Sequence, residues 1–182
     1  MSSEADQELP AVNLNTTKGR DYLWSKTKAA FKYIYEHRYT SYDWYLKADD
    51  DTYVIVENLK YFLSSQSSKE LVYFGARLGV TLKNGFMSGG AGYVLSQTAL
   101  KKFVTEGIPN EQYCSPHDTV SEDVEMAICL EKIGVQPGES RDAQEKHRFL
   151  AEEPEALLAN DKNWVRNWTF YPMKSVYNKF SM

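Results

Sequence analysis

The sequence predicts an α/β fold in which a mixed sheet is flanked by helices, and three observations lead to this prediction. Short apolar runs rich in β-forming residues alternate with segments of helical periodicity. The chain has 182 residues, 42% of them hydrophobic, which suits one domain that buries about two thirds of its unfolded surface. An acidic turn and a glycine-rich loop lie between these elements, where open α/β sheets bind ligands.

The first half of the chain predicts two helices around a buried strand. A polar, unpatterned lead-in over residues 1–17 is followed by helical spacing over residues 19–38. The apolar face of that helix comprises Leu23, Thr27, Ala30, Phe31 and Ile34. Residues 43–48 form an apolar run that predicts a strand. A second helix follows, and its buried side is expected to hold Ile55, Leu59, Phe62 and Leu63.

The second half predicts a strand and two capped helices. Residues 71–78 are rich in β-formers. After the glycine loop, Ser96 is a good N-cap for a helix over residues 97–107, which Gly107 is expected to end at the C′ position. Ser121 is expected to cap a further helix that stops at Gly134.

Composition and charge exclude some partners. The net charge is −4 and no basic cluster is present, which argues against binding to nucleic acid. There is no run of 18 apolar residues and no signal-peptide pattern at the N-terminus, so the sequence predicts no membrane anchor in this chain. The aromatic share is high, with 13 Tyr and 4 Trp residues, and such rings offer flat faces on which sugars stack.

Three consecutive carboxylates follow the strand at residues 43–48. Asp49 and Asp51 can point hard oxygen ligands toward one cation, and Mg²⁺ or Mn²⁺ fits because these ions take few carboxylates and complete their shell with water and phosphate. The alternative is an acidic cap on the following helix. A cap needs only one acid, so the metal site is the favoured interpretation.

Two further features suggest a ligand site, and each has a structural alternative. Glu122 and Asp123 begin a helix, where they either complement its dipole or supply a general base for an inverting sugar transfer. Gly89, Gly90 and Gly92 either form a tight turn or let the backbone approach a sugar or nucleotide.

The two cysteines leave a choice that their spacing does not resolve. Cys114 and Cys129 could close a loop of about 16 residues, worth roughly 3 kcal/mol if oxidised, or they could be buried free thiols.

Several long motifs carry a resemblance to a known family. In order, they are WYLKADDDTYVIVENLKYFL, YFGARL, FMSGGAGYVLSQTALKKF, SEDVEMAICLEKIGV and GESRDAQEKHRF. Together they resemble the core 1 β1,3-galactosyltransferases (glycoprotein-N-acetylgalactosamine 3-β-galactosyltransferases), within the fringe-like β1,3-glycosyltransferases. The resemblance covers residues 8–150, with a weaker similarity at 163–172. It implies a partial GT-A fold, with residues 18–182 as the C-terminal portion of that domain.

The resemblance also implies a reaction and a site. The reaction is inverting transfer of galactose from UDP-galactose to the 3-hydroxyl of GalNAc on Ser or Thr of a glycoprotein. Asp49 and Asp51 would hold Mn²⁺, with Asp49 and Asp50 beside the donor. Glu122 and Asp123 would supply the base, with Asp123 favoured. The glycine loop, at Gly89, Gly90 and Gly92, would lie beside the transferred sugar.

The remaining implications concern the acceptor, the disulfide and the compartment. Trp164, Trp168 and Tyr171 would stack on the acceptor sugar, and Cys114 and Cys129 would pair as a disulfide. Family members are type II membrane proteins of the Golgi or ER lumen.

Departures from the family pattern lead to a second hypothesis. The family's anchor, its first nucleotide-binding strands and its C-terminal metal-binding histidine have no counterpart here, so we expect weak or absent transfer. The alternative is a truncated, inactive paralogue or a chaperone-like binding protein on the same fold. An open sheet edge would favour self-association, for instance as a homodimer.

Overall fold

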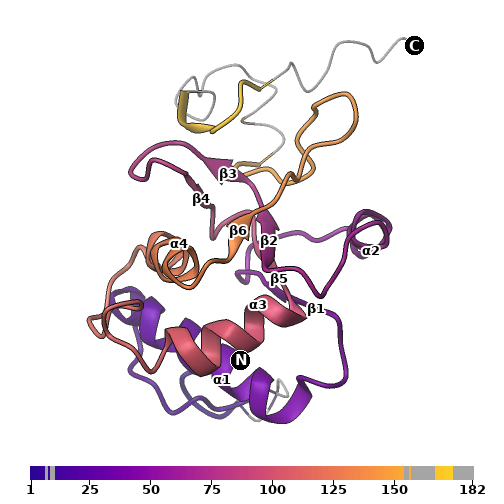
Figure 1. Cartoon of the computed structure of the whole chain (residues 1–182). Helices are drawn as coiled ribbons and strands as arrows, with labels where there is room; N and C mark the ends of the chain where they lie inside the picture. The colour runs from indigo at the N-terminus through magenta and orange to yellow at the C-terminus, as the bar shows by residue number, and fades with distance from the viewer. Residues whose placement is uncertain (7, 9–10, 154–155, 157–166, 174–182) are drawn as a thin grey trace.

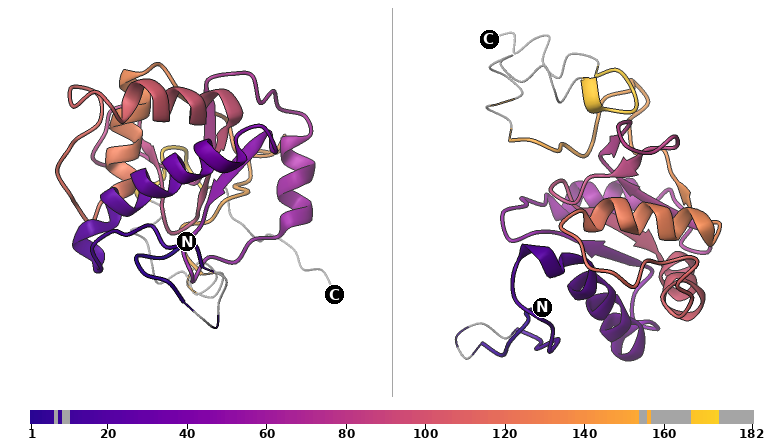
Figure 2. Two further views of the ribbon diagram at one scale, coloured as in Figure 1. Left: turned by 90° about the horizontal axis from the view of Figure 1, so that it is seen from below. Right: turned by 90° about the vertical axis from the view of Figure 1, so that its left-hand side faces the viewer.

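A computed structural model describes the chain except for residues 7, 9–10, 154–155, 157–166 and 174–182. A four-stranded sheet forms the centre, and helices cover both of its faces (Figures 1 and 2). The predicted α/β class, a mixed sheet flanked by helices, is therefore confirmed. No helix within the described residues combines the length and the apolar character that crossing a bilayer requires.

The main sheet has the strand order β1-β5-β2-β6. Its strands are β1 (Trp44–Lys47), β5 (Tyr93–Ser96), β2 (Val72–Gly75) and β6 (Gln136–Pro137). Strand β5 runs antiparallel to β1 and β2, whereas β6 runs parallel to β2. The carboxyl ends of β1, β2 and β6 therefore meet at one edge of the sheet. Two short strands, β3 (Arg77–Leu78) and β4 (Phe86–Met87), form a separate hairpin next to this edge (Figure 1).

Three helices pack on one face of the sheet. They are α1 (Leu23–Arg38), which follows the short η1 turn (Arg20–Tyr22), α3 (Gln97–Lys102) with its π-helical continuation η2 (Phe103–Gly107), and α4 (Glu122–Lys132). Their core side chains include Trp24, Phe31, Leu100, Phe103 and Met126, packed with Tyr73 and Tyr93 of the sheet. Helix α2 (Val56–Leu63) covers the other face, where Phe62 and Leu63 pack on Phe74 and Val94.

Several local predictions are refined by the structure. The strand predicted at 71–78 divides between β2 and β3. Ile55 precedes α2 and is 52% exposed, so its predicted burial is wrong. Ser96 caps α3 as predicted, because its Oγ accepts a hydrogen bond from the Ala99 backbone N–H at 3.0 Å. Ser121 lies at the N-cap of α4 but makes no side-chain capping bond there.

Gly107 is required for a reason other than the one predicted. It does not adopt the left-handed conformation of a C′ glycine. A Cβ at this position would lie 3.0 Å from the Cys129 sulfur and 3.1 Å from the Cys114 sulfur. The glycine therefore makes room for the Cys114–Cys129 disulfide, which is present in the structure as the family resemblance implies.

The disulfide predicts a measurable contribution to stability. The double variant Cys114→Ala/Cys129→Ala should lose about 3 kcal/mol of unfolding free energy, since the bridge closes a loop with a sequence separation of 15. Urea denaturation of both proteins, with and without reductant, would measure this. Reductant should lower the unfolding free energy of the wild type toward that of the variant, and it should leave the unfolding free energy of the variant unchanged. Equal stability of wild type and variant under oxidising conditions would contradict the prediction.

Candidate active site

Three segments far apart in the sequence meet at the carboxyl edge of the sheet. The acidic turn follows β1, the glycine loop joins β4 to β5, and α4 begins with Glu122. Hydrogen bonds connect the first two: the Asp49 backbone N–H donates to Thr52 Oγ1, and that hydroxyl donates to the Gly90 carbonyl, each at 3.0 Å. The segments singled out from the sequence thus form one site.

Lys47, the last residue of β1, lies at the centre of this site. Its ammonium nitrogen is 2.6 Å from Asp49 Oδ1 and 2.8 Å from Glu122 Oε1. The Tyr93 hydroxyl donates to Glu122 Oε2 at 2.9 Å. Both carboxylate oxygens of Glu122 are therefore engaged, and the residue is only 4% exposed. The ammonium also lies 5.7 Å from the centre of the Tyr93 ring.

Burial and charge act against each other in this network. Burial raises the pKa of the Glu122 carboxyl, and the Lys47 ammonium offsets only part of this rise. Burial would lower the pKa of Lys47, but attraction to Glu122 and Asp49 raises it overall. The pKa of Tyr93 is raised well above its ordinary value by burial and by the charge of Glu122. At neutral pH, Lys47 therefore carries the positive charge that compensates the buried carboxylate.

Asp123 has a more accessible environment than its neighbour. It is half-buried, and its Oδ2 accepts a hydrogen bond from the Gly89 backbone N–H at 2.9 Å. Its Oδ1 accepts from the Val124 N–H. Asp123 therefore connects the first turn of α4 directly to the glycine loop while remaining open to solvent.

The three glycines serve different purposes. A Cβ on Gly89 would lie 2.9 Å from Glu122 Oε1 and 3.3 Å from Lys47 Nζ. Gly92 has a φ of 72°, and its Cβ would lie 2.9 Å from the Lys47 carbonyl oxygen. Gly90, in contrast, is exposed, with nothing nearer to its Cβ position than Ser88 Oγ at 4.0 Å. Gly89 thus leaves room for the Glu122 and Lys47 side chains, and Gly92 leaves room for the Lys47 carbonyl. Gly90 leaves open surface beside them.

The acidic turn has the donor chemistry for a divalent cation. Asp49, Asp50 and Asp51 are exposed, and carboxylate oxygens suit Mg²⁺ or Mn²⁺. Within the described residues no group of three or more His, Cys, Asp and Glu side chains is placed to enclose a metal. Exposed carboxylates suit an ion that completes its shell with water or phosphate oxygens, and Asp49 Oδ1 also pairs with Lys47 at 2.6 Å.

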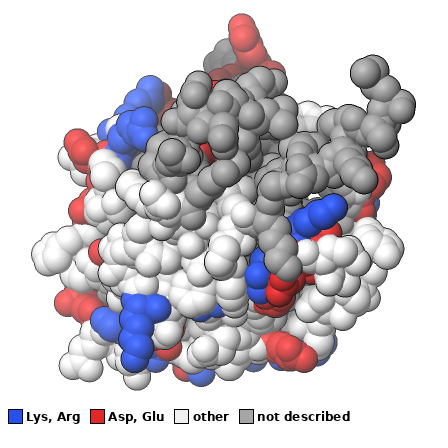
Figure 3. All heavy atoms as spheres, turned by 90° about the horizontal axis from the view of Figure 1, so that it is seen from above, with Lys and Arg blue, Asp and Glu red and all other residues white. Residues whose placement is uncertain are grey.

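Two of the predicted acceptor residues, Trp168 and Tyr171, contact the segments around β3 and Arg141. Trp164 falls outside the described residues. Trp168 is 44% exposed, and its carbonyl accepts a hydrogen bond from the Gly79 N–H. The Tyr171 hydroxyl accepts from Arg77 at 3.3 Å, and the Arg141 guanidinium lies 3.7 Å from the centre of the Tyr171 ring. Seen from above the view of Figure 1, basic and acidic side chains are interspersed on the part of the surface that is not grey (Figure 3).

The mixed sheet flanked by helices is consistent with a Fringe-like GT-A fold, and the acidic turn and the glycine loop lie at its carboxyl edge. The Fringe-like family matches the chain over residues 1–151, and the chain belongs to this family. A Xenopus laevis protein, glycoprotein-N-acetylgalactosamine 3-beta-galactosyltransferase 1, is 41% identical over 178 residues, which cover 95% of this chain and 49% of the relative.

More distant relatives carry other transferase names. Human chondroitin sulfate synthase 3 is 29% identical over 145 residues, covering 71% of this chain and 16% of that protein. Mouse beta-1,3-glucosyltransferase is 28% identical over 140 residues, covering 74% and 27% respectively. The chain thus spans about half the length, or less, of the relatives it matches.

Sequence reasoning missed Lys47 and Tyr93 as members of the site. A signal for Lys47 was present, because a lone lysine in an apolar strand, two residues before a run of carboxylates, is unusual. Tyr93 gave no comparable signal, since an aromatic residue at the start of a strand is ordinary core. Its role depends on the contact with Glu122, which is 29 residues away in sequence.

Proposed function

We propose that this chain forms the catalytic part of a core 1 β1,3-galactosyltransferase. The reaction is inverting transfer of galactose from UDP-galactose to the 3-hydroxyl of GalNAc on Ser or Thr of a glycoprotein. The observation that carries the proposal is the meeting of the acidic turn, the glycine loop and Asp123 at one sheet edge. The identity to the Xenopus laevis enzyme supports this choice of sugars.

On the donor side, Asp49 and Asp51 would hold Mn²⁺ against the diphosphate, with Asp50 beside the donor. The bound ion would neutralise charge on the departing UDP. Gly90 offers exposed backbone next to the carboxylates, where the galactose can lie without meeting a side chain. Lys47 holds Asp49 and Glu122 in place.

On the acceptor side, Asp123 is the proposed general base. Its carboxylate would take the proton from the GalNAc 3-hydroxyl as that oxygen bonds to the anomeric carbon of galactose and the bond to UDP breaks. Glu122 lies next to it in sequence, but both of its oxygens are engaged by Lys47 and Tyr93, which suits a positioning role. Trp164 and Trp168 remain the proposed acceptor-stacking residues, and Tyr171 would join them only through the part of its ring that the Arg141 guanidinium, 3.7 Å from the ring centre, leaves open.

The cellular setting follows from the same proposal. The disulfide suits an oxidising compartment, so we place the chain in the Golgi or ER lumen, as part of a type II membrane protein. The partners would be UDP-galactose and a GalNAc-bearing glycoprotein, and the protein would act alone or as a homodimer.

A second candidate is a non-catalytic binding protein on the same fold. The observation that favours it is the ion pair between Lys47 Nζ and Asp49 Oδ1 at 2.6 Å, which already engages one oxygen of a proposed metal ligand.

The deciding experiment measures Mn²⁺-dependent transfer from UDP-galactose to a GalNAc-bearing peptide. Asp51→Asn should abolish Mn²⁺-dependent UDP binding and transfer, because it removes a proposed metal ligand. Asp21→Asn, a surface carboxylate on η1, is the matched control and should leave both unchanged. Transfer that survives Asp51→Asn would contradict the assigned metal site. UDP binding without transfer from a folded wild type would favour the binding protein.

A further inference from the structure

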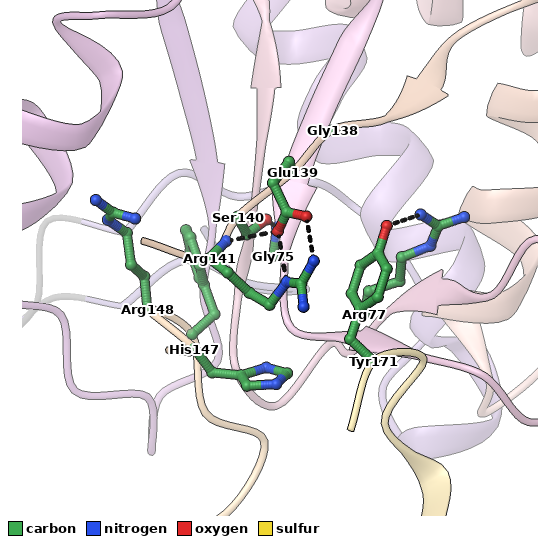
Figure 4. Close-up of a pocket in the computed structure, with 10 residues that line it drawn as sticks. Gly75, Arg77, Gly138, Glu139, Ser140, Arg141, His147, Arg148 and Tyr171 are labelled. Atoms are coloured by element: carbon green, nitrogen blue, oxygen red, sulfur yellow. Dashed lines mark hydrogen bonds and ion pairs between the residues drawn. The ribbon is translucent and has the colours of Figure 1, made fainter. Parts of the chain in front are cut away.

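A small pocket opens at the carboxyl edge of the sheet, at the ends of β2 and β6 (Figure 4). We call it the arginine pocket. The lining side chains that matter here are Arg77, Glu139, Arg141, His147, Arg148 and Tyr171. The pocket lining thus holds three guanidinium groups and one carboxylate, in a chain whose net charge is −4. This excess of positive charge is unusual enough to suggest an anionic ligand.

Two of the arginines are occupied by the protein itself. Arg141 donates from Nε and Nη2 to the two carboxylate oxygens of Glu139, at 2.9 and 2.7 Å. Arg77 donates to the Asn84 carbonyl and to the Tyr171 hydroxyl. These bonds fix the guanidinium planes on either side of Tyr171 and build the rigid wall of the pocket.

Arg148 and His147 retain binding capacity. The Arg148 guanidinium lies 5.1 Å from the centre of the Phe62 ring and makes no hydrogen bond or ion pair with the described residues. His147 Nε2 is buried and likewise has no hydrogen-bond partner among them. Burial and the neighbouring Arg141 lower the pKa of His147, so its imidazole is neutral at neutral pH. Among the lining arginines, Arg148 is thus the one whose guanidinium hydrogens are unpaired within the described residues, and its charge acts on Asp142 only through space.

The arginine pocket lies on the strand next to Tyr93, which belongs to the Lys47 network. Gly75 lines the pocket and pairs with Tyr93 across the β2–β5 ladder, where neighbouring strands are about 4.8 Å apart. The Tyr93 hydroxyl in turn bonds to Glu122. Tyr93 pairs on its other side with Lys47 of β1, and the acidic turn follows that strand. The pocket is thus on the side of the sheet edge away from the proposed metal carboxylates.

We propose that the arginine pocket binds a carboxylate of the acceptor polypeptide, so that the enzyme prefers GalNAc flanked by Asp or Glu. This inference rests on the proposed function. The donor diphosphate is assigned to the acidic turn across β5, which leaves the pocket to the acceptor. Arginine forks match carboxylate geometry, and the Arg148 guanidinium is available to form such a pair.

The test measures binding, by fluorescence anisotropy, of labelled GalNAc peptides whose flanking residues are Asp and Glu, Asn and Gln, or Lys. Wild type should bind the acidic peptide about threefold to fivefold more tightly than the neutral one, the range expected for an exposed ion pair, and less so at high salt. Arg148→Glu should make the protein bind the Lys peptide more tightly than the acidic one. Arg148→Gln should remove the preference for the acidic peptide. Arg20→Glu, an exposed arginine on η1, is the matched control and should keep the wild-type order.

The outcomes separate this inference from the proposed function. Equal binding of all three peptides by wild type would overturn the carboxylate pocket and leave the acceptor assignment intact. Weaker UDP binding by Arg148→Glu, without a change in peptide preference, would instead assign the pocket to the donor phosphates and also overturn the inference. If no GalNAc peptide binds, the proposed acceptor and the inference both fail.

Discussion

Asp123→Asn is expected to lower galactose transfer by about 10²- to 10⁴-fold, the usual effect of removing a general base. An amide does not take up the proton that the GalNAc hydroxyl must lose. It can still accept the hydrogen bond from the Gly89 N–H, so the glycine loop should keep its position. Mn²⁺-dependent UDP binding should therefore remain, and steady-state kinetics should place the loss in kcat.

A matched control, Glu125, lies two positions further along the same helix turn. Glu125→Gln removes a half-buried carboxylate from the first turn of α4, whereas the hydrogen bond to the Gly89 N–H is made by Asp123. This variant should transfer galactose at a rate close to wild type. An equal fall in both variants would mean that α4 needs its acidic first turn only for stability, and Asp123 would lose its assignment as the base.

The sequence singled out three segments that the structure brings into contact, but it did not predict which contacts each residue makes. The acidic turn, the glycine loop and the start of α4 do meet, because strand ends and helix starts gather at one edge of an α/β sheet. The glycines were expected to admit a ligand. Gly89 and Gly92 instead admit Glu122 and Lys47 of the same chain, and only Gly90 is open. Such a distinction depends on contacts between distant segments, which residue spacing does not encode.

The arginine pocket shows the same limit more strongly. Arg77 and Arg141 lie 3.3 Å and 3.7 Å from the hydroxyl and the ring centre of Tyr171, although the three come from separate parts of the chain. They meet because the two-residue strand β6 pairs with β2 and directs the following loop back over the sheet edge. A strand this short has too little pattern to be recognised in the sequence.

Lys47→Met is expected to destabilise the protein by about 3 to 5 kcal/mol, the usual cost of removing one partner from a buried ion pair. The variant leaves Glu122, which is 4% exposed, without the ammonium that compensates its charge. Urea denaturation at neutral pH would measure the loss. Lys47→Arg, which keeps the positive charge, should lose much less. The double variant Lys47→Met/Glu122→Gln should recover much of the stability, since the amide carries no charge to compensate.

The pH dependence of the Lys47→Met defect distinguishes lost charge compensation from lost packing. Burial already raises the pKa of Glu122, and removal of the ammonium should raise it further. A carboxyl with a raised folded-state pKa stabilises the fold fully when protonated, below its unfolded pKa, and this contribution is lost as the pH rises through the folded pKa. The stability gap between wild type and Lys47→Met should therefore be widest at neutral pH and narrow as the pH falls toward 4.5, the ordinary value.

A gap that stays constant with pH would mean that Lys47 acts through the packing of its aliphatic stem, and the electrostatic account of the site would be wrong. A gap that narrows would show that one ammonium compensates the charge of Glu122 next to the proposed base. Because the same ammonium lies 2.6 Å from Asp49, the stability of the fold and the arrangement of the proposed metal turn would then depend on one residue. Lys47 would link the donor side of the site to its acceptor side.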